Sequence, residues 1–254
     1  YFDAQWYAKG MSLVKLYHSY EKNYLYPKAA WISHTNTQRV ALFLEDHPNV
    51  SKNKVQTIKN YPPKSWVTTR ETSAIKPQVN ITPIKLVYVG SLGINNTFIQ
   101  EFCNWVQSKK GAVTFTIYAF NTTKPTYNYL SSLHSEYINF RPGGIEYDKI
   151  PQVLSNYDIG VILYKGNTLN AKFCVSNKLF EYLACGLEVW VTKEQEGTLP
   201  YLDSNNQPRV MALDFENFDQ TLIKSHKAAR ILPYKTHLFN FENQLDSIVA
   251  AMLN

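Results

Sequence analysis

Regular alternation of two kinds of segment is the feature of this sequence that most constrains its fold. Between residues 84 and 213, short apolar runs rich in β-branched residues alternate with longer stretches whose apolar residues recur at helical spacing. Strands that alternate with helices pair in parallel through right-handed crossovers, so the predicted fold class is α/β with a doubly wound parallel sheet. We predict helices at 96–109, 126–135, 146–156, 215–230 and 238–253, and strands at 84–90, 113–120, 137–143, 157–164, 188–192 and 209–213.

The first 60 residues predict a smaller α/β fragment. A helix at 4–24 leads a short buried strand at 29–33, a helix at 35–46 with a Thr or Asn N-cap, and a strand at 54–60. A β-α-β fragment of this length is too short for a complete α/β domain. We therefore predict a partial second α/β domain at residues 1–60.

Residues 61–83 predict an irregular linker, because the segment carries four prolines and no periodicity. The larger domain then spans 84–236, and a last helix follows at 237–254. The 254 residues suit two small domains. Because the sequence begins with Tyr1 rather than Met, we expect it to be part of a longer protein.

Composition excludes several classes of function. Hydrophobic residues make up 44% of the chain and charged residues 18%, which is typical of a globular protein. The net charge of +6 favours acidic partners, but no basic cluster is denser than KNK at 52–54, so we expect no nucleic-acid partner. No apolar run approaches the roughly 20 residues that span a bilayer. Peripheral contact with an anionic membrane surface stays open.

The cysteines and histidines favour no metal centre. Cys103, Cys174 and Cys185 form no CxxC pair, and packed free thiols suit a reducing, cytoplasmic compartment. The histidines show neither HxxxH nor HExxH spacing, and the sequence contains no Asp-x-Asp. We therefore predict no metal site and no cofactor.

The first strand of the larger domain ends in a glycine-containing loop, VGSLGINN at 89–96. Gly90 and Gly93 allow a tight turn around Ser91, and a predicted helix follows directly. Because backbone N–H groups at a helix N-terminus attract anions, we predict that this loop binds a phosphate. The alternative is an ordinary strand-to-helix turn without a ligand.

The segment VSNKLFEYLACGLEVWV at 175–191 predicts a helix, a stop at Gly186 and a strand. Ser176 can cap the helix, so that the N–H groups that begin at Asn177 point into the crevice at the carboxyl ends of the strands. The packing stripe of this helix is formed by leucines spaced four residues apart, at Leu179, Leu183 and Leu187.

Lys178 and Glu181 lie off that stripe, three residues apart on another face of the helix. One interpretation is a surface ion pair that contributes a few tenths of a kcal/mol. The other places Lys178 at a diphosphate and Glu181 on a ribose, whose two vicinal hydroxyls suit a carboxylate acceptor. Arg141, in NFRPGG at 139–144, is a further candidate for contact with a base or phosphate, with a structural turn as the alternative.

These segments resemble a known family. SNKLFEYLACGLEV is similar to the nucleotide-sugar motif of GT-B glycosyltransferases, above all the retaining family 4, in which the pattern P-x-K-L-x-E-Y-x-A-x-G-x-P-V recurs. KLVYVGSL resembles the opening strand and glycine loop of their C-terminal domain. FNFENQLDSIVAAML resembles their last helix, which implies that residues 237–254 return toward the N-terminal domain. The resemblance covers essentially the whole chain, with AAWISHTN and IKNYPP similar to the end of the N-terminal domain.

The resemblance implies a Rossmann-like domain that binds a nucleotide diphosphate sugar, with an incomplete N-terminal domain. The implied reaction is glycosyl transfer with retention and without a metal, to a carbohydrate or lipid-linked acceptor in polysaccharide biosynthesis. The implied location is the cytoplasm, including the inner face of the membrane. The implied donor-binding residues are Gly90, Ser91, Gly93, Arg141, Lys165, Ser176, Asn177, Lys178 and Glu181.

The sequence departs from the family pattern at three places. Phe173 stands where the family has the first Glu of a Glu-x7-Glu pair, which contacts the transferred sugar in many members, and Glu188 replaces the usual Pro. The basic residue that often follows the glycine loop is absent, and Lys165 or Lys172 is the candidate to replace its charge. A nucleotide-sugar 2-epimerase on the same fold and a non-catalytic nucleotide-sugar-binding module therefore stay open as alternatives.

Overall fold

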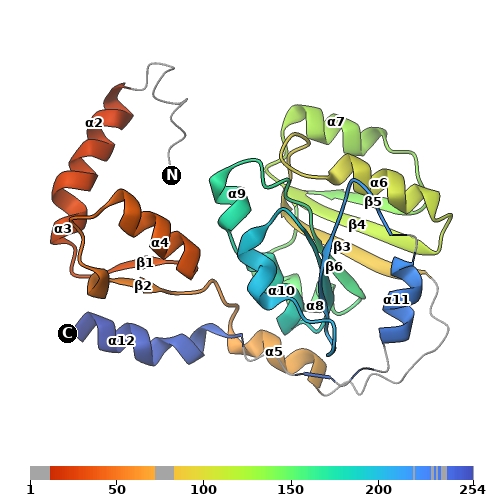
Figure 1. The fold of residues 1–254 in the computed structure, drawn as a ribbon. Helices are drawn as coiled ribbons and strands as arrows, with labels where there is room; N and C mark the ends of the chain where they lie inside the picture. Colours follow the sequence, from red (N-terminus) through yellow and green to blue (C-terminus); the bar gives the residue numbers. More distant parts are fainter. Residues whose placement is uncertain are drawn as a thin grey trace.

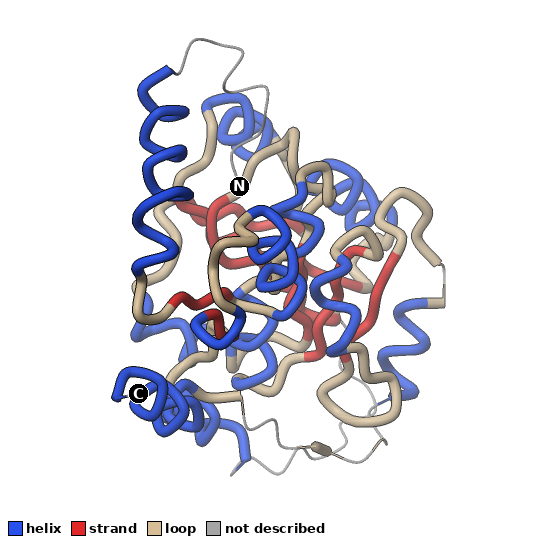
Figure 2. The backbone as a smooth tube through the Cα atoms, turned by 60° about the vertical axis from the view of Figure 1, so that its left-hand side comes forward, coloured by secondary structure: helices blue, strands red, loops and turns tan. Residues whose placement is uncertain are grey.

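The computed structural model describes residues 12–71, 83–219, 221–229, 232, 234–235 and 239–253, which form two units (Figure 1). The larger unit is built on a six-stranded sheet and the smaller unit on a two-stranded sheet. The C-terminal helix lies beside the smaller unit in both views (Figures 1 and 2).

The larger sheet is parallel throughout, in the order β5-β4-β3-β6-β7-β8. Its strands are β3 (Ile84–Ser91), β4 (Val113–Phe120), β5 (Ile138–Pro142), β6 (Ile159–Ile162), β7 (Glu188–Thr192) and β8 (Val210–Leu213). The predicted α/β class is confirmed, including the sixth strand, and the predicted ranges of β4 and β7 agree residue for residue. The carboxyl ends of all six strands share one edge, where such sheets bind ligands.

Helices cover both faces of this sheet (Figure 1). One face packs against α6 (Ile99–Ser108), α7 (Lys124–Ser132) and α11 (Leu222–Ala229), and the other against α5 (Lys64–Glu71), α8 (Ile150–Leu154) and α10 (Asn177–Ala184). Consecutive residues of a strand point to opposite faces, so Leu86 joins one apolar layer and Val87 the other. The short helix α9 (Leu169–Phe173) follows β6.

The smaller unit is a parallel β-α-β fragment led by a helix. It contains α2 (Ser12–Tyr20), a π-helical turn (Glu21–Leu25), α3 (Tyr26–Lys28), β1 (Ile32–His34), α4 (Thr37–Asp46) and β2 (Val55–Thr57). The predicted Asn N-cap of α4 is confirmed, because Oδ1 of Asn36 accepts the N–H of Arg39. The predicted buried strand at 29–33 is shorter, and its residues are half-buried or exposed, because a two-stranded sheet covers little of its own surface. Residues 4–11 of the predicted first helix lie outside the described residues.

The segment 61–83 was predicted to be an irregular linker. This prediction is wrong for Lys64–Glu71, which form helix α5. Pro62 and Pro63 precede the helix, and a carboxylate oxygen of Glu242 accepts the N–H of its first residue, Lys64. Trp66 and Val67 are buried against the larger unit. Tertiary packing of Trp66 therefore holds a helix that periodicity alone does not reveal. Residues 72–82 lie outside the described residues.

The last helix, α12 (Leu245–Leu253), follows a 3₁₀ turn at Phe241–Gln244 and lies beside the smaller unit. The side chain of Gln244 donates to the carbonyl of Lys59 and accepts its N–H, both at 2.9 Å. Other 3₁₀ turns lie at Lys52–Lys54, Tyr147–Lys149 and Glu196–Tyr201.

Candidate functional site

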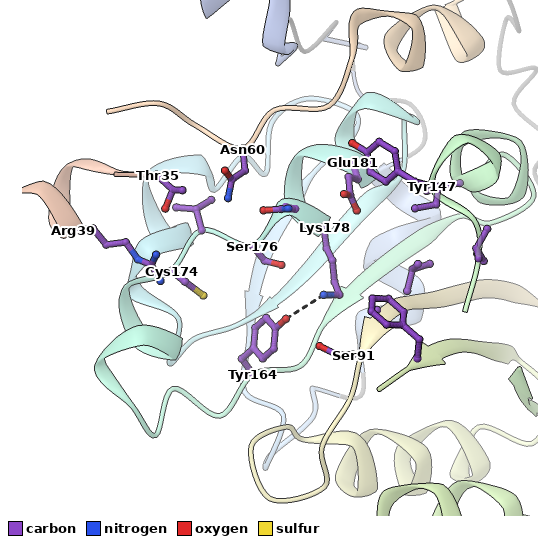
Figure 3. A pocket seen from close by; sticks show the side chains of 17 residues that line it. Thr35, Arg39, Asn60, Ser91, Tyr147, Tyr164, Cys174, Ser176, Lys178 and Glu181 are labelled. Carbon is purple, nitrogen blue, oxygen red and sulfur yellow. Dashed lines mark hydrogen bonds between the residues drawn. The ribbon is translucent and has the colours of Figure 1, made fainter. Parts of the chain in front are cut away.

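A cavity of about 540 Å³ opens at the carboxyl edge of the larger sheet, between the two units. This volume is ordinary for a small-molecule site. The cavity is lined from β3 by Val89, Gly90 and Ser91, from the start of α10 by Cys174–Lys178 and Glu181, from the smaller unit by Thr35, Arg39 and Asn60, and elsewhere by Phe120, Ile145, Tyr147, Ile150 and Tyr164 (Figure 3).

Lys178 reaches from α10 across to the glycine loop that follows β3. A β-carbon built on Gly90 would lie 2.8 Å from both Cε and Nζ of Lys178, and Gly90 has a φ of +133°. Both its conformation and this close approach require glycine. The ammonium donates to the hydroxyl of Tyr164 at 3.1 Å (Figure 3). The sequence therefore brings the predicted loop and the predicted lysine together at one point.

The ammonium of Lys178 also lies over two aromatic rings, 5.3 Å from the centre of Tyr88 and 5.4 Å from that of Tyr164. Burial alone would lower the pKa of Lys178, but the neighbouring hydroxyls of Tyr88 and Tyr164 more than offset it, so the pKa lies above its ordinary value. Lys178 is therefore a positive charge at neutral pH, placed in the cavity wall.

The N-terminus of α10 contributes backbone N–H groups to the same wall. Ser176 occupies the N-cap position, as predicted, but its side chain makes no capping hydrogen bond. Its carbonyl accepts the N–H of Leu179. The N–H groups of the first turn add to the positive potential at Lys178, because the helix dipole has its positive end there.

Glu181 lies one turn further along α10, beside Tyr147 (Figure 3). Its exposed fraction is 9%, so the surface ion-pair interpretation is wrong for this residue. Burial raises the pKa of Glu181, and the charge of Lys178 opposes the rise only in part. A carboxylate so placed is costly unless a ligand or solvent supplies hydrogen-bond donors.

The part of the lining next to Glu181 contains apolar groups. Tyr147 lies beside Glu181 in the same segment as Ile145 and Ile150, and the ring of Phe120 lies against Gly144 of that segment. Tyr147 also packs on Trp66 of α5, with ring centres 4.7 Å apart. The lining thus has an aromatic end next to Glu181, while Lys178 lies at Gly90.

Three predicted site residues do not line this cavity. The loop turns away after Ser91, and Gly93 instead packs against Asn96. Arg141 is exposed on β5, the edge strand. Lys165 forms an ion pair with Glu101 at 3.0 Å, because its neighbour Tyr164 faces the cavity and consecutive residues of an extended segment point to opposite sides.

Lys172, the other candidate to supply the missing charge, pairs with Glu196 at 2.9 Å and also lies outside the lining. Sequence reasoning missed Phe120, Tyr147 and Tyr164 of the larger unit, and Thr35, Arg39 and Asn60 of the smaller unit. For the residues of the smaller unit, the predicted N-cap at Asn36 was the available sequence signal. Asn36 begins α4 and donates a hydrogen bond to the carbonyl of Phe173, which brings the first turn of α4 to the cavity.

Glu188, which replaces the family's usual proline, is explained by packing at the opposite end of β7. It is 2% exposed and accepts two hydrogen bonds from the buried guanidinium of Arg209, at 2.9 and 3.0 Å. Trp190 Nε1 donates to it at 2.6 Å, and His226 Nδ1 lies 3.1 Å away. Burial raises the pKa of Glu188, but His226 and Arg209 more than offset this, so its pKa lies below the ordinary value.

Within the described residues, no three His, Cys, Asp or Glu side chains are grouped so that they could hold a metal ion. The helices of the described ranges are all too short or too polar to cross a bilayer.

The sequence matches no family model, and it matches no curated protein. Solved structures do resemble it. A glycosyltransferase from Rickettsia africae ESF-5 has a TM-score of 0.59 at 10% identity, over 94% of this chain and 67% of the solved chain. The apo lipopolysaccharide outer core galactosyltransferase WaaB has a TM-score of 0.52 at 11% identity, over 87% and 62%. The N-terminal domain of Candida albicans trehalose-6-phosphate phosphatase has a TM-score of 0.54 at 10% identity, over 89% and 58%.

In three further matches this chain spans 49%, 42% and 52% of the solved protein, so it corresponds to about half of their length. At these identities the likeness concerns the arrangement of the backbone. The parallel six-stranded sheet agrees with a Rossmann-like domain of such a fold. The chain has the fold of the GT-B glycosyltransferases.

Proposed function

We propose that the cavity binds the nucleoside diphosphate part of a nucleotide diphosphate sugar, and that the chain is the donor-binding part of a glycosyltransferase. The observation that carries the proposal is the ammonium of Lys178, held against Gly90 at the N-terminus of α10. A fixed cation and free helix N–H groups at one point are what a diphosphate requires.

The polarity of the cavity supports one orientation of the ligand. The base lies at the aromatic end, against Phe120 and Tyr147, where stacking stabilises any base. Glu181 accepts hydrogen bonds from the ribose hydroxyls, which offsets the cost of its burial. Lys178 and the first turn of α10 then bind the diphosphate.

The reaction that follows is displacement of the diphosphate from the anomeric carbon of the sugar. The bond from that carbon to a phosphate oxygen breaks, and its electron pair stays on the diphosphate. A bond to an acceptor hydroxyl oxygen forms, and the hydroxyl proton passes to the leaving diphosphate. Negative charge grows on the leaving diphosphate, where Lys178 and the helix N-terminus stabilise it. The proposed transfer retains the configuration of the anomeric carbon and uses neither a metal nor another cofactor.

The proposed acceptor is a carbohydrate or lipid-linked saccharide, and the proposed setting is polysaccharide biosynthesis in the cytoplasm, including the inner face of the membrane. Two observations support peripheral membrane contact. The net charge is +6. Leu13, Leu16 and Tyr17 of α2 are exposed, by 78%, 69% and 60%.

The cavity lining bears on the alternatives. Among the described residues that line it, Glu181 is the only carboxylate and no histidine is present, which gives no support to a 2-epimerase acting by paired acids and bases. A binding module without turnover differs from the transferase in activity rather than in binding, so assays of turnover separate these two.

Isothermal titration with UDP, GDP, ADP and their sugars tests the proposal. We expect one nucleoside diphosphate to bind, and Lys178→Met to weaken it by about tenfold to a hundredfold, the range of a charged hydrogen bond. Lys172→Met is the matched control, because that lysine pairs with Glu196 outside the cavity. Absence of binding by every nucleotide at millimolar concentration, or equal loss in both variants, refutes the proposal.

A further inference from the structure

The end of the cavity that faces the smaller unit holds a second cation, Arg39, which the proposed binding of a nucleoside diphosphate does not use. Arg39 lies in the first turn of α4, and its side chain runs toward Cys174 (Figure 3). Lys178 lies on the other side of Cys174 and Ser176 in the same view. The two cations therefore stand at different places along one cavity.

Contacts from both units hold Arg39 in place. Its N–H donates to Oδ1 of Asn36 at 2.8 Å, and its Nη2 donates to Oδ1 of Asn170 on α9. Asn36 in turn donates from Nδ2 to the carbonyl of Phe173 at 2.7 Å. A guanidinium oriented in advance loses little freedom when it binds, and its planar donors match a carboxylate or phosphate.

The charges around this end of the cavity are positive. Among the described lining residues, the only carboxylate is Glu181, which lies near Tyr147 at the other end (Figure 3). The thiol of Cys174 lies between the cations. Burial raises the pKa of the Cys174 thiol. The hydrogen bond with Gln195 and then the charges of Arg39 and Lys178 act in the opposite direction. A group that lies between the two cations therefore meets a potential that favours negative charge.

We propose that Arg39 binds a second anionic group, a carboxylate or phosphate carried by the transferred sugar or by its acceptor. The inference rests on the proposed function, because it places the diphosphate at Lys178 and the sugar between Lys178 and Arg39. An anionic group accepts two parallel hydrogen bonds from a guanidinium, whereas a sugar hydroxyl accepts fewer and brings no charge. The geometry thus favours an acidic substrate over a neutral one.

The first experiment uses the wild-type chain and calorimetric titration. UDP, UDP-glucose and UDP-glucuronate form one series, and GDP, GDP-mannose and GDP-mannuronate form the other. In a second arm, glucose and glucose 6-phosphate are titrated with and without saturating UDP or GDP. We expect an anionic ligand of one arm to bind about tenfold more tightly than its neutral partner.

Two variants then assign the preference to Arg39. Arg39→Gln should abolish it and leave the affinity for the bare nucleoside diphosphate unchanged. Asn170→Ala removes the same hydrogen bond between the units but keeps the guanidinium, so it should retain the preference. If Arg39→Gln does not fold, Arg39→Lys keeps the charge without the planar donors and should lose most of the preference.

The arm that shows the preference identifies the source of the anionic group. A preference for the uronate assigns it to the transferred sugar, and a preference for glucose 6-phosphate assigns it to the acceptor. The inference is overturned if wild type prefers no anionic ligand in either arm, or if Arg39→Gln weakens every ligand by the same factor. Failure of all nucleotides to bind refutes the proposed function instead, and the glucose 6-phosphate arm still tests Arg39.

Discussion

Gly90 and Lys178 share one space, since a β-carbon at position 90 would lie 2.8 Å from the end of the lysine side chain. The lysine can move, but only by leaving the position in which it donates to Tyr164. The glycine cannot accept a side chain cheaply either, because its φ is +133°. The position of the cation is thus coupled to the conformation of the loop.

Gly90→Ala should therefore lower both stability and nucleotide affinity. The strained backbone costs about 1–3 kcal/mol of unfolding free energy. Displacement of the ammonium should weaken binding of the nucleoside diphosphate by about tenfold. Thermal melting and calorimetric titration measure the two effects.

Gly111→Ala is the control for Gly90→Ala. Gly111 also has a left-handed φ, of +86°, but it lies in the turn before β4, at the other end of the sheet. The Gly111→Ala variant should be less stable than wild type but should bind the nucleoside diphosphate with unchanged affinity. In a Lys178→Met background, Gly90→Ala should cause no further loss of affinity, and an undiminished loss there would contradict the coupling.

Glu181→Gln should stabilise the free chain at neutral pH. Because burial raises the pKa of Glu181, the folded state binds a proton more tightly than the unfolded state does. The stability from this group is present below pH 4.5, the ordinary pKa of a glutamate, and is lost as pH rises through the folded pKa. Melting temperatures of the variant and wild type should agree at low pH and diverge at pH 7, with the variant higher.

The same change should weaken nucleotide binding by about 1–3 kcal/mol, the range for a charged hydrogen bond. A 2′-deoxy nucleoside diphosphate tests the contact. Wild type should bind it more weakly than the ribose form, and Glu181→Gln should bind the two alike. If the variant keeps the wild-type preference for ribose, Glu181 does not hold the sugar hydroxyls.

Gly160→Ala should be among the most destabilising changes in the larger unit. A β-carbon there would lie 2.2 Å from the ring of Tyr182, which is fully buried between β6 and α10. Overpacking of this kind costs about 1–3 kcal/mol and sometimes more. Denaturant unfolding measures it. Tyr182→Phe is the control, since it keeps the ring and removes only the hydroxyl that accepts the N–H of Val89. A Gly160→Ala chain as stable as wild type would show that α10 can move away at no cost.

Glu188→Met should cost about 3–5 kcal/mol, because it leaves the guanidinium of Arg209 buried without its carboxylate. The double variant with Arg209→Met should recover much of that loss. Since the pKa of Glu188 lies below its ordinary value, its contribution is present above that value and is lost as pH falls through the folded pKa. Chemical unfolding from pH 7 down to about pH 3 tests this, and a loss of stability equal in wild type and double variant would contradict it.

The strands of the larger sheet could be predicted best, because their pattern is contained in a few consecutive residues. In β4 buried and half-buried residues alternate along the strand, so its period of two is visible in the sequence. Helix α5 was missed because its stability comes from Trp66 against the larger unit rather than from an amphipathic repeat. Its first N–H is satisfied by Glu242, which is far away in the sequence.

The candidate site divides in the same way. Lys178 and Glu181 stand in one local motif, so their proximity follows from helix geometry. Arg39 and Asn60 reach the cavity only through the docking of the two units, which no local pattern encodes. Lys165 is predicted as a replacement for the missing basic residue, but its residue type does not reveal the direction of its side chain. Its neighbour Tyr164 faces the cavity instead, and Lys165 pairs with Glu101.

The paired bonds between Gln244 and Lys59 bear on how the cavity can close. In the described part of the chain, the backbone passes between the units twice, and the two passages are fastened side by side, with Phe241 also donating to the carbonyl of Pro62. Two units joined by one backbone segment can rotate relative to each other about three axes. Two connecting segments that are hydrogen-bonded to each other resist twisting and sliding of the units, so bending at the connection is the easiest motion. A hinge of this kind would restrict relative motion of the units chiefly to one bending angle, and bending would change the distance between Arg39 and the larger unit.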